Sequence, residues 1–368
     1  MKVTDVELIP LALPFERPYV TARGTLDARE MFLIRVRTDE GIEGLGEAVP
    51  LSLRGGADMR SVYRALLKAS RRLKRSDLSD FSGPEPLMAA VDVFIHTAAG
   101  RRLPAPVKAA VEMAIFDLAG KASGRPLWSL LKAERAQPVR CNATLIAAAP
   151  AEVAADAERW AALGFDTFKL KLGSTDDVAR VRAVREALGV EATIRVDANG
   201  IWSVEEALGV IKLIEPLGIE LVEQPVTGSR EMAQITGAGP VLIAADELVA
   251  SVKDARRARE ASACDLATVK LAKVGGIGEA NGIAGHLPIY LSSALDGPVG
   301  IAAAGHAAQA LPAEGPAAGL AHGLATQLLF ADTTASAACE IADGTLLLSS
   351  RPGLGVELDE KAVERLRT

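Results

Sequence analysis

Hydrophobic and polar residues alternate in two different ways along this chain, and the change falls near Pro138. Residues 2–14 and 31–38 alternate with a period close to two, which is typical of half-buried β-strands. Asp39-Glu40-Gly41 follows the second strand as a hairpin signal. Apolar residues then recur with helical spacing in three stretches: 58–75, 84–99 and 105–122. Strands followed by helices predict an α+β unit over residues 1–130.

After Pro138, short apolar runs alternate with helical stretches. We expect strands at 139–145, 167–173, 193–199, 220–225, 241–247, 266–272, 288–296 and, more weakly, near 323–330. A polar residue ends each of six runs: Lys171, Asp197, Glu223, Asp246, Lys270 and Ser293. Their spacing of 23 to 26 residues suits one strand, one helix and two loops. A (β/α)8-type barrel over 131–335 is therefore predicted.

A doubly wound sheet is the alternative to the barrel. Its phosphate loop would be GGIGEANG at 275–282, where Asn281 replaces the third glycine of the dinucleotide-binding pattern. Residues 336–368 again carry strand and turn signals, and we expect them to return to the N-terminal unit.

Lysine is used sparingly: the chain has 13 lysines against 28 arginines. Lys169, Lys171, Lys270 and Lys273 nevertheless lie inside apolar segments. Residues two apart in a strand share a face, so Lys169 and Lys171 point the same way. A desolvated lysine can give up its proton, whereas an arginine cannot, so these positions suggest acid–base chemistry.

Three carboxylates, Asp197, Glu223 and Asp246, come from successive strand ends, which meet at the mouth of a barrel. Buried together they require a positive partner. Oxygen ligands alone favour Mg²⁺, with Mn²⁺ as the alternative, and the lack of a nearby histidine disfavours zinc. Plain ion pairing with the lysines stays open.

The lysines lie on both sides of the carboxylates along the chain. A neutral Lys171 would be a competent general base, and a metal-bound substrate carboxylate would stabilise an enediolate. The pattern therefore indicates proton abstraction next to a carboxylate. Lys273 comes three residues after Lys270, so we expect it to face the other side of the strand, outside the site.

Five segments carry a family resemblance: KLK at 169–171, DAN at 197–199, EQP at 223–225, DE at 246–247 and VKLAKVGGI at 269–277. They resemble the enolase superfamily, and more narrowly its muconate-lactonising-enzyme subgroup. Mandelate-racemase-type members use a histidine base on a later strand, which residues 288–296 lack. The resemblance implies a modified (β/α)7β barrel with an N-terminal α+β capping domain.

The same resemblance implies roles for eight residues. Asp197, Glu223 and Asp246 would bind the metal ion, Lys171 would be the acid/base, Lys270 would act on the opposite face, Lys169 would tune Lys171, and Asn199 and Glu247 would support the ligands.

Within the subgroup, three segments resemble o-succinylbenzoate synthases: 17–30, 141–144 and 292–311. The resemblance implies a syn dehydration in menaquinone biosynthesis, with Lys171 removing the α-proton and protonating the departing hydroxide. Candidate substrate contacts are Ser293, Asp296, Arg23, Gly24 and Asn142.

Other activities of the same site remain open: N-acylamino-acid racemase, dipeptide epimerase and muconate cycloisomerase. Dipeptide epimerases typically carry Asp-x-Asp near the eighth strand, and residues 323–333 lack it. A Schiff-base lyase and a non-catalytic barrel are further alternatives.

Composition narrows the partners. The net charge is −6 without a basic block, and aromatics make up 4%, so we expect no nucleic-acid binding. No apolar run reaches the ~18 residues of a membrane span. Three scattered cysteines and an N-terminus without a secretory signal predict a cytoplasmic protein. We expect a small carboxylate substrate and leave a homo-oligomer open.

Overall fold

The computed structural model describes residues 1–21, 24–52, 55–75, 91, 94, 97, 100–146, 148–173, 176–312 and 314–368. Its central element is a parallel sheet of seven strands that follow one another in chain order. The strands are β5 (Ala143–Leu145), β6 (Thr167–Lys171), β7 (Thr193–Asp197), β8 (Ile219–Glu223), β9 (Leu242–Ala245), β10 (Leu266–Lys270) and β11 (Ile289–Ser292).

Residues 322 and 323 close this sheet into a barrel. His322 forms a parallel bridge to Cys141, beside β5, and Gly323 forms one to Ser292, at the end of β11. A Cβ on Gly323 would lie 2.5 Å from Ser292 Oγ, so a larger residue here would have to displace the side chain of Ser292. The eighth strand that we expected near 323–330 is therefore reduced to two bridging residues. The 3₁₀ helix η4 (Thr326–Leu329) follows them.

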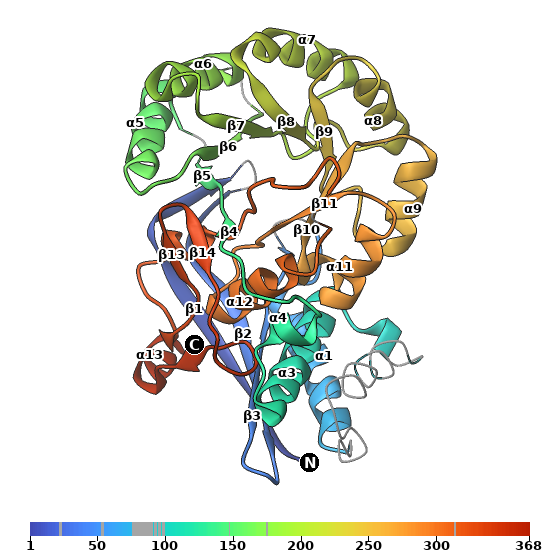
Figure 1. The fold of residues 1–368 in the computed structure, drawn as a ribbon, viewed down its shortest axis with the longest axis vertical. Helices are drawn as coiled ribbons and strands as arrows, with labels where there is room; N and C mark the ends of the chain where they lie inside the picture. Colours follow the sequence, from blue (N-terminus) through green and yellow to red (C-terminus); the bar gives the residue numbers. More distant parts are fainter. Residues whose placement is uncertain are drawn as a thin grey trace.

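Helices surround the barrel on its outer side (Figure 1). They are α5 (Pro150–Ala161), α6 (Asp177–Leu188), α7 (Val204–Ile214) with the 3₁₀ turn η3 (Glu215–Leu217), α8 (Ser229–Thr236), α9 (Val252–Glu260), α11 (Ile277–Ala284) and α12 (Pro298–Ala308). The short α10 (Leu271–Val274) directly follows β10 and packs against residues 105–123. Alternate strand residues, such as Phe168 and Leu170 of β6, are buried apolar side chains. Their neighbours Lys169 and Lys171 then face the barrel interior.

The N-terminal part forms an antiparallel sheet with helices packed against it. It comprises β1 (Val3–Thr21), β2 (Gly24–Thr38), β3 (Glu43–Ala48), α1 (Met59–Leu73), the 3₁₀ turn η2 (Gly100–Arg102), α3 (Ala105–Ser123) and α4 (Leu127–Leu130). β3 packs so tightly on α3 that a Cβ on Gly46 would lie 2.0 Å from the carbonyl oxygen of Ala110. We call residues 1–130 the cap.

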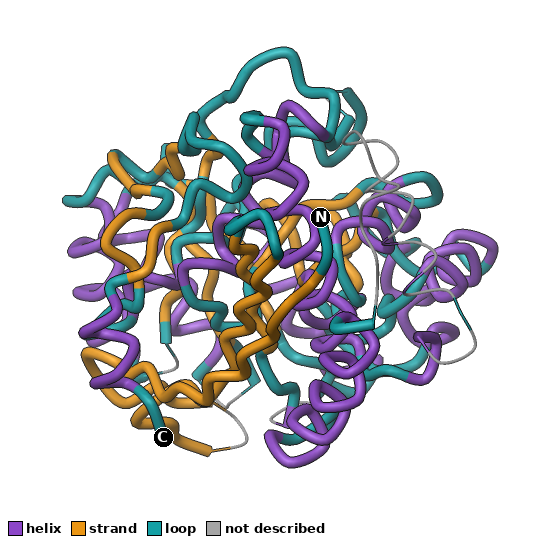
Figure 2. The backbone as a smooth tube through the Cα atoms, turned by 90° about the horizontal axis from the view of Figure 1, so that it is seen from below, coloured by secondary structure: helices purple, strands orange, loops and turns teal. Residues whose placement is uncertain are grey.

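The C-terminal segment runs back to the cap. It contains β12 (Ala335–Ala337), β13 (Glu340–Ala342), β14 (Thr345–Leu347), β15 (Glu357–Leu358) and α13 (Glu360–Leu366), and β14 pairs with β4 (Val139–Arg140). Arg367 bridges to Leu11 of β1. Figure 2 accordingly shows the C-terminus beside the long strands. The division into 1–130, 131–335 and 336–368 as domains stays a prediction.

Two buried carboxylates of the cap reach the N-termini of barrel helices. Glu112 of α3 accepts hydrogen bonds from the amides of Ile277 and Gly278, the latter at 2.9 Å, at the start of α11. Glu47 of β3 accepts one from the amide of Gly297, at 2.6 Å, just before α12. Carboxyl oxygens suit this place, because the first N–H groups of a helix have no acceptor within the helix.

The fold class predicted from the sequence, a modified barrel with an α+β cap, is confirmed. The expected helices at 58–75 and 105–122 are α1 and α3. The expected helix at 84–99 lies almost entirely outside the described residues. Among the described residues, no helix has both the length and the apolar character needed to cross a bilayer.

Candidate active site

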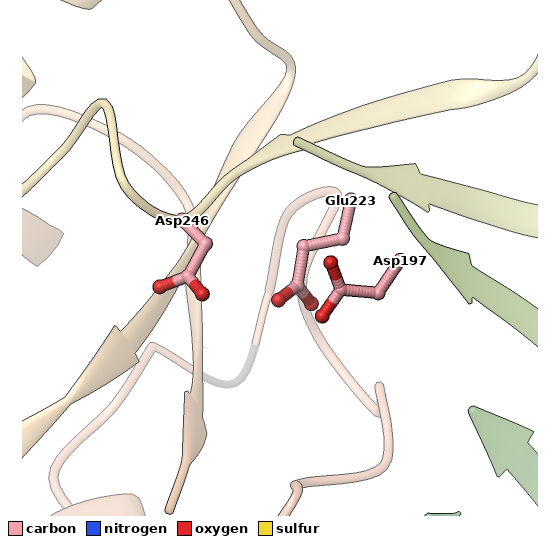
Figure 3. Close-up of side chains that lie close together, drawn as sticks. All are labelled: Asp197, Glu223 and Asp246. Carbon is pink, nitrogen blue, oxygen red and sulfur yellow. The ribbon is translucent and has the colours of Figure 1, made fainter. Parts of the chain in front are cut away.

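The carboxylates of Asp197, Glu223 and Asp246 meet at the carboxyl ends of three neighbouring strands. Asp197 ends β7 and is in register with Glu223, which ends β8, while Asp246 directly follows β9. All three side chains are fully buried, and one ligand atom of each lies within 4.8 Å of the others. Figure 3 shows Asp197 and Glu223 next to each other and Asp246 facing them. The structure thus brings together the three residues that the strand periodicity predicts to converge.

Two lysines of β6 pair with the carboxylates on one side of this cluster. Lys169 Nζ lies 2.6 Å from Glu223 Oε2 and 3.0 Å from Asp197 Oδ2. Lys171 Nζ lies 2.5 Å from Asp197 Oδ2. The side chain of Lys171 is 19% exposed, against 6% for Lys169. Of these two ammonium groups, Lys171 is therefore the one more open to an incoming molecule.

Two further lysines pair with Asp246 on the other side. Lys270 Nζ contacts Asp246 Oδ2, and Lys273 Nζ lies 2.7 Å from Asp246 Oδ1. Lys273 also donates to the backbone oxygen of Asp246 at 2.5 Å. Our expectation that Lys273 faces away from the site is wrong. The strand ends at Lys270, and residues 271–274 form the helical turn α10, which brings the side chain three positions later back to the same side.

Burial and the lysines act in opposite directions on the pKa values of this cluster. Burial alone would lower the pKa of Lys169, but Asp197 and Glu223 outweigh it and raise that pKa well above its usual value. Burial would likewise raise the pKa of Asp197, but Lys169 and Lys171 outweigh it and hold that pKa well below its usual value. Lys169 and Asp197 are therefore held in their charged forms in the folded chain. Ion pairing, the alternative left open above, does occur among them.

Asn199 and Gln224 fix the cluster from the loops after β7 and β8. Asn199 Oδ1 accepts from Lys171 Nζ at 3.1 Å, and Asn199 Nδ2 donates to Glu247 Oε1 at 3.2 Å. Its backbone φ of 49° lies in the left-handed region, which asparagine tolerates. The side-chain oxygen of Gln224 accepts from the backbone amide of Asp246 at 2.8 Å. Gln224, which the sequence analysis did not single out, thus anchors the backbone of Asp246.

One oxygen of Glu223 is left open. Its Oε2 accepts from Lys169 and from the hydroxyl of Tyr290, both at 2.6 Å. Its Oε1 is buried and has no hydrogen-bond partner among the described residues. An orphaned oxygen on one of three clustered carboxylates fits a hard divalent cation, because such cations take oxygen ligands. The residues present therefore suit Mg²⁺.

The predicted substrate contacts Ser293 and Asp296 are tied into the loop after β11. Ser293 Oγ donates to Asp296 Oδ2 at 2.9 Å, and the hydroxyl of Thr326 donates to Ser293 Oγ at 2.8 Å. Ser292, not Ser293, is the residue in register with Lys270. The residue of β11 that lies beside Lys270 is therefore Ser292, one position before the Ser293 that the spacing indicated.

The remaining predicted contacts are spread over two segments. Asn142 is buried beside the closing strand residues, and its backbone amide donates to the backbone oxygen of His322 at 2.9 Å. Its side-chain Oδ1 has no hydrogen-bond partner among the described residues. Gly24 is the first residue of β2, where it pairs with Thr21. Arg23 lies outside the described residues.

Asp332, the one acid in residues 323–333, pairs with an arginine of the C-terminal helix. It forms a two-pronged ion pair with Arg365 of α13, with Nη2 and Nε of Arg365 at 2.8 Å and 3.0 Å from Asp332 Oδ2. Both side chains are partly exposed. Asp332 is therefore committed to joining the C-terminal helix to the loop after η4.

Family comparisons cover most of the chain. Residues 4–132 match the family described as mandelate racemase / muconate lactonizing enzyme, N-terminal domain. Residues 152–362 match the one described as enolase C-terminal domain-like.

Several characterised proteins are similar to the chain. An L-Ala-D/L-Glu epimerase of Clostridium acetobutylicum is 33% identical over 327 residues, which are 84% of this chain and 87% of the epimerase. A muconate cycloisomerase of Rhodococcus opacus is 30% identical over 99% of this chain and 98% of its own length. An o-succinylbenzoate synthase of Thermobifida fusca is 39% identical, over 53% of this chain and 62% of the synthase.

Solved structures show the same architecture. A muconate lactonizing enzyme of Pseudomonas fluorescens, complexed with muconolactone, has a TM-score of 0.91 at 28% identity, covering 100% of this chain and 99% of that one. A dipeptide epimerase of Enterococcus faecalis, complexed with Mg and L-Leu-L-Tyr, has a TM-score of 0.88 at 27% identity, covering 97% of this chain and all of the other.

Proposed function

We propose that this chain, which belongs to the enolase superfamily and to its muconate-lactonizing-enzyme subgroup, is a magnesium-dependent dehydratase of the o-succinylbenzoate synthase type. Membership makes it an enzyme of that superfamily. The dehydration itself, and the place of that reaction in menaquinone biosynthesis, are the parts that we propose.

The observation that carries the proposal is the arrangement of lysines on both sides of a buried carboxylate triad with one open oxygen. We assign Mg²⁺ to Asp197, Glu223 and Asp246. When bound there, the ion would hold the substrate carboxylate and stabilise the negative charge that develops on it as the α-proton leaves.

The protein residues then divide the proton transfers. In 2-succinyl-6-hydroxy-2,4-cyclohexadiene-1-carboxylate, Lys171 Nζ takes the proton from the ring carbon that carries the carboxylate. It then gives this proton to the hydroxyl that leaves from the neighbouring carbon, so that water and an aromatic ring are formed. Lys171 suits this role because it is more exposed than Lys169 and Lys270, while Lys270 supplies a fixed positive charge from the opposite side.

The charges of the site support an anionic substrate. Four lysines (Lys169, Lys171, Lys270 and Lys273) and four acids (Asp197, Glu223, Asp246 and Glu247) gather in the described part of the site. A divalent cation would add two positive charges to this set. The carboxylates of the proposed substrate would offset that added charge, which matters in a site with fully buried acids.

Asp332 supports dehydration over dipeptide epimerisation. Dipeptide epimerases typically place an Asp-x-Asp near the eighth strand, where it holds the substrate ammonium group. Here the one acid of that segment is bound to Arg365 instead. The 39% identity to an o-succinylbenzoate synthase, over about half of this chain, points the same way.

A second candidate is isomerisation at the same site. The epimerase and the cycloisomerase match far more of the chain than the synthase does. Racemases, epimerases and cycloisomerases would use the same lysines and carboxylates. N-acylamino-acid racemase activity is one form of this second candidate. Mn²⁺ is the alternative to Mg²⁺ at the same carboxylates for each of these reactions.

Substrate turnover tests the proposal. Purified protein with Mg²⁺ should convert the cyclohexadiene to its aromatic product, followed by absorbance. Lys171→Ala should lower kcat by about 10³-fold, in the range lost with a general acid–base group. Lys212→Ala, which changes an exposed lysine of α7, is the matched control and should keep wild-type kcat.

Two results would decide against dehydration. One is full turnover by metal-free enzyme. The other is deuterium uptake at the α-carbon of dipeptides or N-acylamino acids in deuterated water, with no conversion of the cyclohexadiene, which would establish the second candidate.

A further inference from the structure

Tyr290 lies on β11, two positions before Ser292, which is the last residue of that strand. It is fully buried in a small interior cluster with Leu221, Ala244 and Leu266, which come from three other strands of the barrel. The guanidinium carbon of Arg195 lies 4.9 Å from the centre of its ring. The ring is thus fixed on several sides, and its hydroxyl has a fixed place.

That hydroxyl connects two polar groups in a directed chain. The hydroxyl of Thr268, on β10, donates to the Tyr290 oxygen at 2.7 Å. Tyr290 in turn donates to Glu223 Oε2 at 2.6 Å. Each hydroxyl has one proton, so the chain runs in a single direction and ends on the carboxylate.

The two oxygens of Glu223 differ because of this contact. Oε2 receives two donors, Tyr290 and Lys169, whereas Oε1 receives none among the described residues. A carboxylate with one oxygen held twice cannot rotate freely about its last bond. Its other oxygen is therefore kept in a fixed place within the cluster of Asp197, Glu223 and Asp246.

We propose that Tyr290, supported by Thr268, is a positioning residue that orients Glu223 for the divalent cation. This inference rests on the proposed magnesium site. It adds that part of the affinity for the metal ion comes from strands β10 and β11, at residues that do not touch the ion. Groups that orient metal ligands in this way typically change metal affinity or activity by about 10–100-fold.

Calorimetric titration of the full chain with Mg²⁺ alone tests the inference. Tyr290→Phe keeps the ring and removes the hydroxyl, and should weaken Mg²⁺ binding by about tenfold. Thr268→Val removes the donor behind Tyr290 and should weaken it less, whereas Thr268→Ser keeps the hydroxyl and should restore wild-type affinity. Tyr63→Phe, at a half-exposed tyrosine of α1, is the control and should change nothing.

The outcomes separate this inference from the proposed function. Wild-type protein that binds no Mg²⁺ overturns both. Wild-type binding together with an affinity within twofold for Tyr290→Phe overturns the positioning role alone. If Tyr290→Phe does not fold, the Thr268 pair decides, because Val must weaken the binding and Ser must not.

Discussion

Asp246 pairs with two lysines, as Asp197 does, because a strand end and a helical turn converge on it. Lys270 is the last residue of β10, and Lys273 lies within α10. Lys273 touches both the carboxylate and the backbone oxygen of Asp246. Lys273 therefore fixes the position of Asp246 as well as offsetting its charge.

Replacement of Lys273 should make the position of Asp246 less well defined. Lys273→Met keeps an unbranched side chain but loses the ammonium group, so we expect Mg²⁺ affinity to fall by about tenfold. Titration calorimetry measures the change, and Lys253→Met, at an exposed position of α9, is the matched control. Unchanged Mg²⁺ affinity in Lys273→Met would contradict the role of Lys273 in holding Asp246 in place.

For single residues, the sequence predicted which side chains meet wherever the strand period of two held. Asp197, Glu223, Asp246, Lys169 and Lys171 were all expected near one another, and they are. Lys273 was misplaced because the period of two ends at Lys270, and the strand expected over 288–296 ends earlier, at Ser292. Tyr290 carried a usable signal, since it stands two positions before Ser292 and so shares its face.

Among the elements, helices α11 and α12 depend on the cap. Glu112 meets the first amides of α11, and Glu47 meets the amide before α12. Near Glu47 lies Asp296, and the guanidinium of Arg29 donates to the neighbouring Ala294 oxygen at 3.0 Å. These partners lie far apart in sequence, so no local pattern could have revealed them.

Glu47 should make the stability of the fold depend on pH. Burial and the charge of Asp296 raise the pKa of Glu47 from 4.5 to about 8. Between these values the folded chain holds a proton that the unfolded chain has released. The contribution of Glu47 to the free energy of unfolding therefore falls as pH rises through this window.

Glu47→Gln should remove this dependence, because the amide does not titrate. Relative to wild type, its free energy of unfolding should improve by on the order of 2 kcal/mol from pH 5 to pH 8. Urea denaturation at several pH values measures the difference. Glu186→Gln on α6 is the exposed control, and parallel pH profiles for Glu47→Gln and wild type would contradict the assignment.

For the molecule as a whole, the repeat of 23 to 26 residues was enough to predict the barrel, since each repeat is one strand and one helix. The closure was not predictable, because it depends on two residues, His322 and Gly323, that form single bridges rather than a strand. The substrate was not predictable either, because the subgroup uses one set of acids and lysines for several reactions.

Removal of the metal ion should stop the reaction and leave the fold intact. The lysines already neutralise the buried acids, so the chain does not depend on the ion for charge balance. We expect EDTA to abolish turnover and excess Mg²⁺ to restore it. Saturating Mg²⁺ should raise the unfolding temperature by roughly 3–6 °C, measured by scanning calorimetry. Cooperative unfolding lost on EDTA treatment would refute this.

The seating of Glu47 and Glu112 on α12 and α11 has a consequence for chimeras. A cap transplanted from another protein would leave the first backbone amides of α11 and α12 without acceptors unless it placed an acid at each of the same two positions. Conversely, an acid at these positions of the cap would lack hydrogen-bond donors if the barrel did not begin its helices there. Matched acids and helix starts, more than overall likeness, therefore decide which halves can be interchanged.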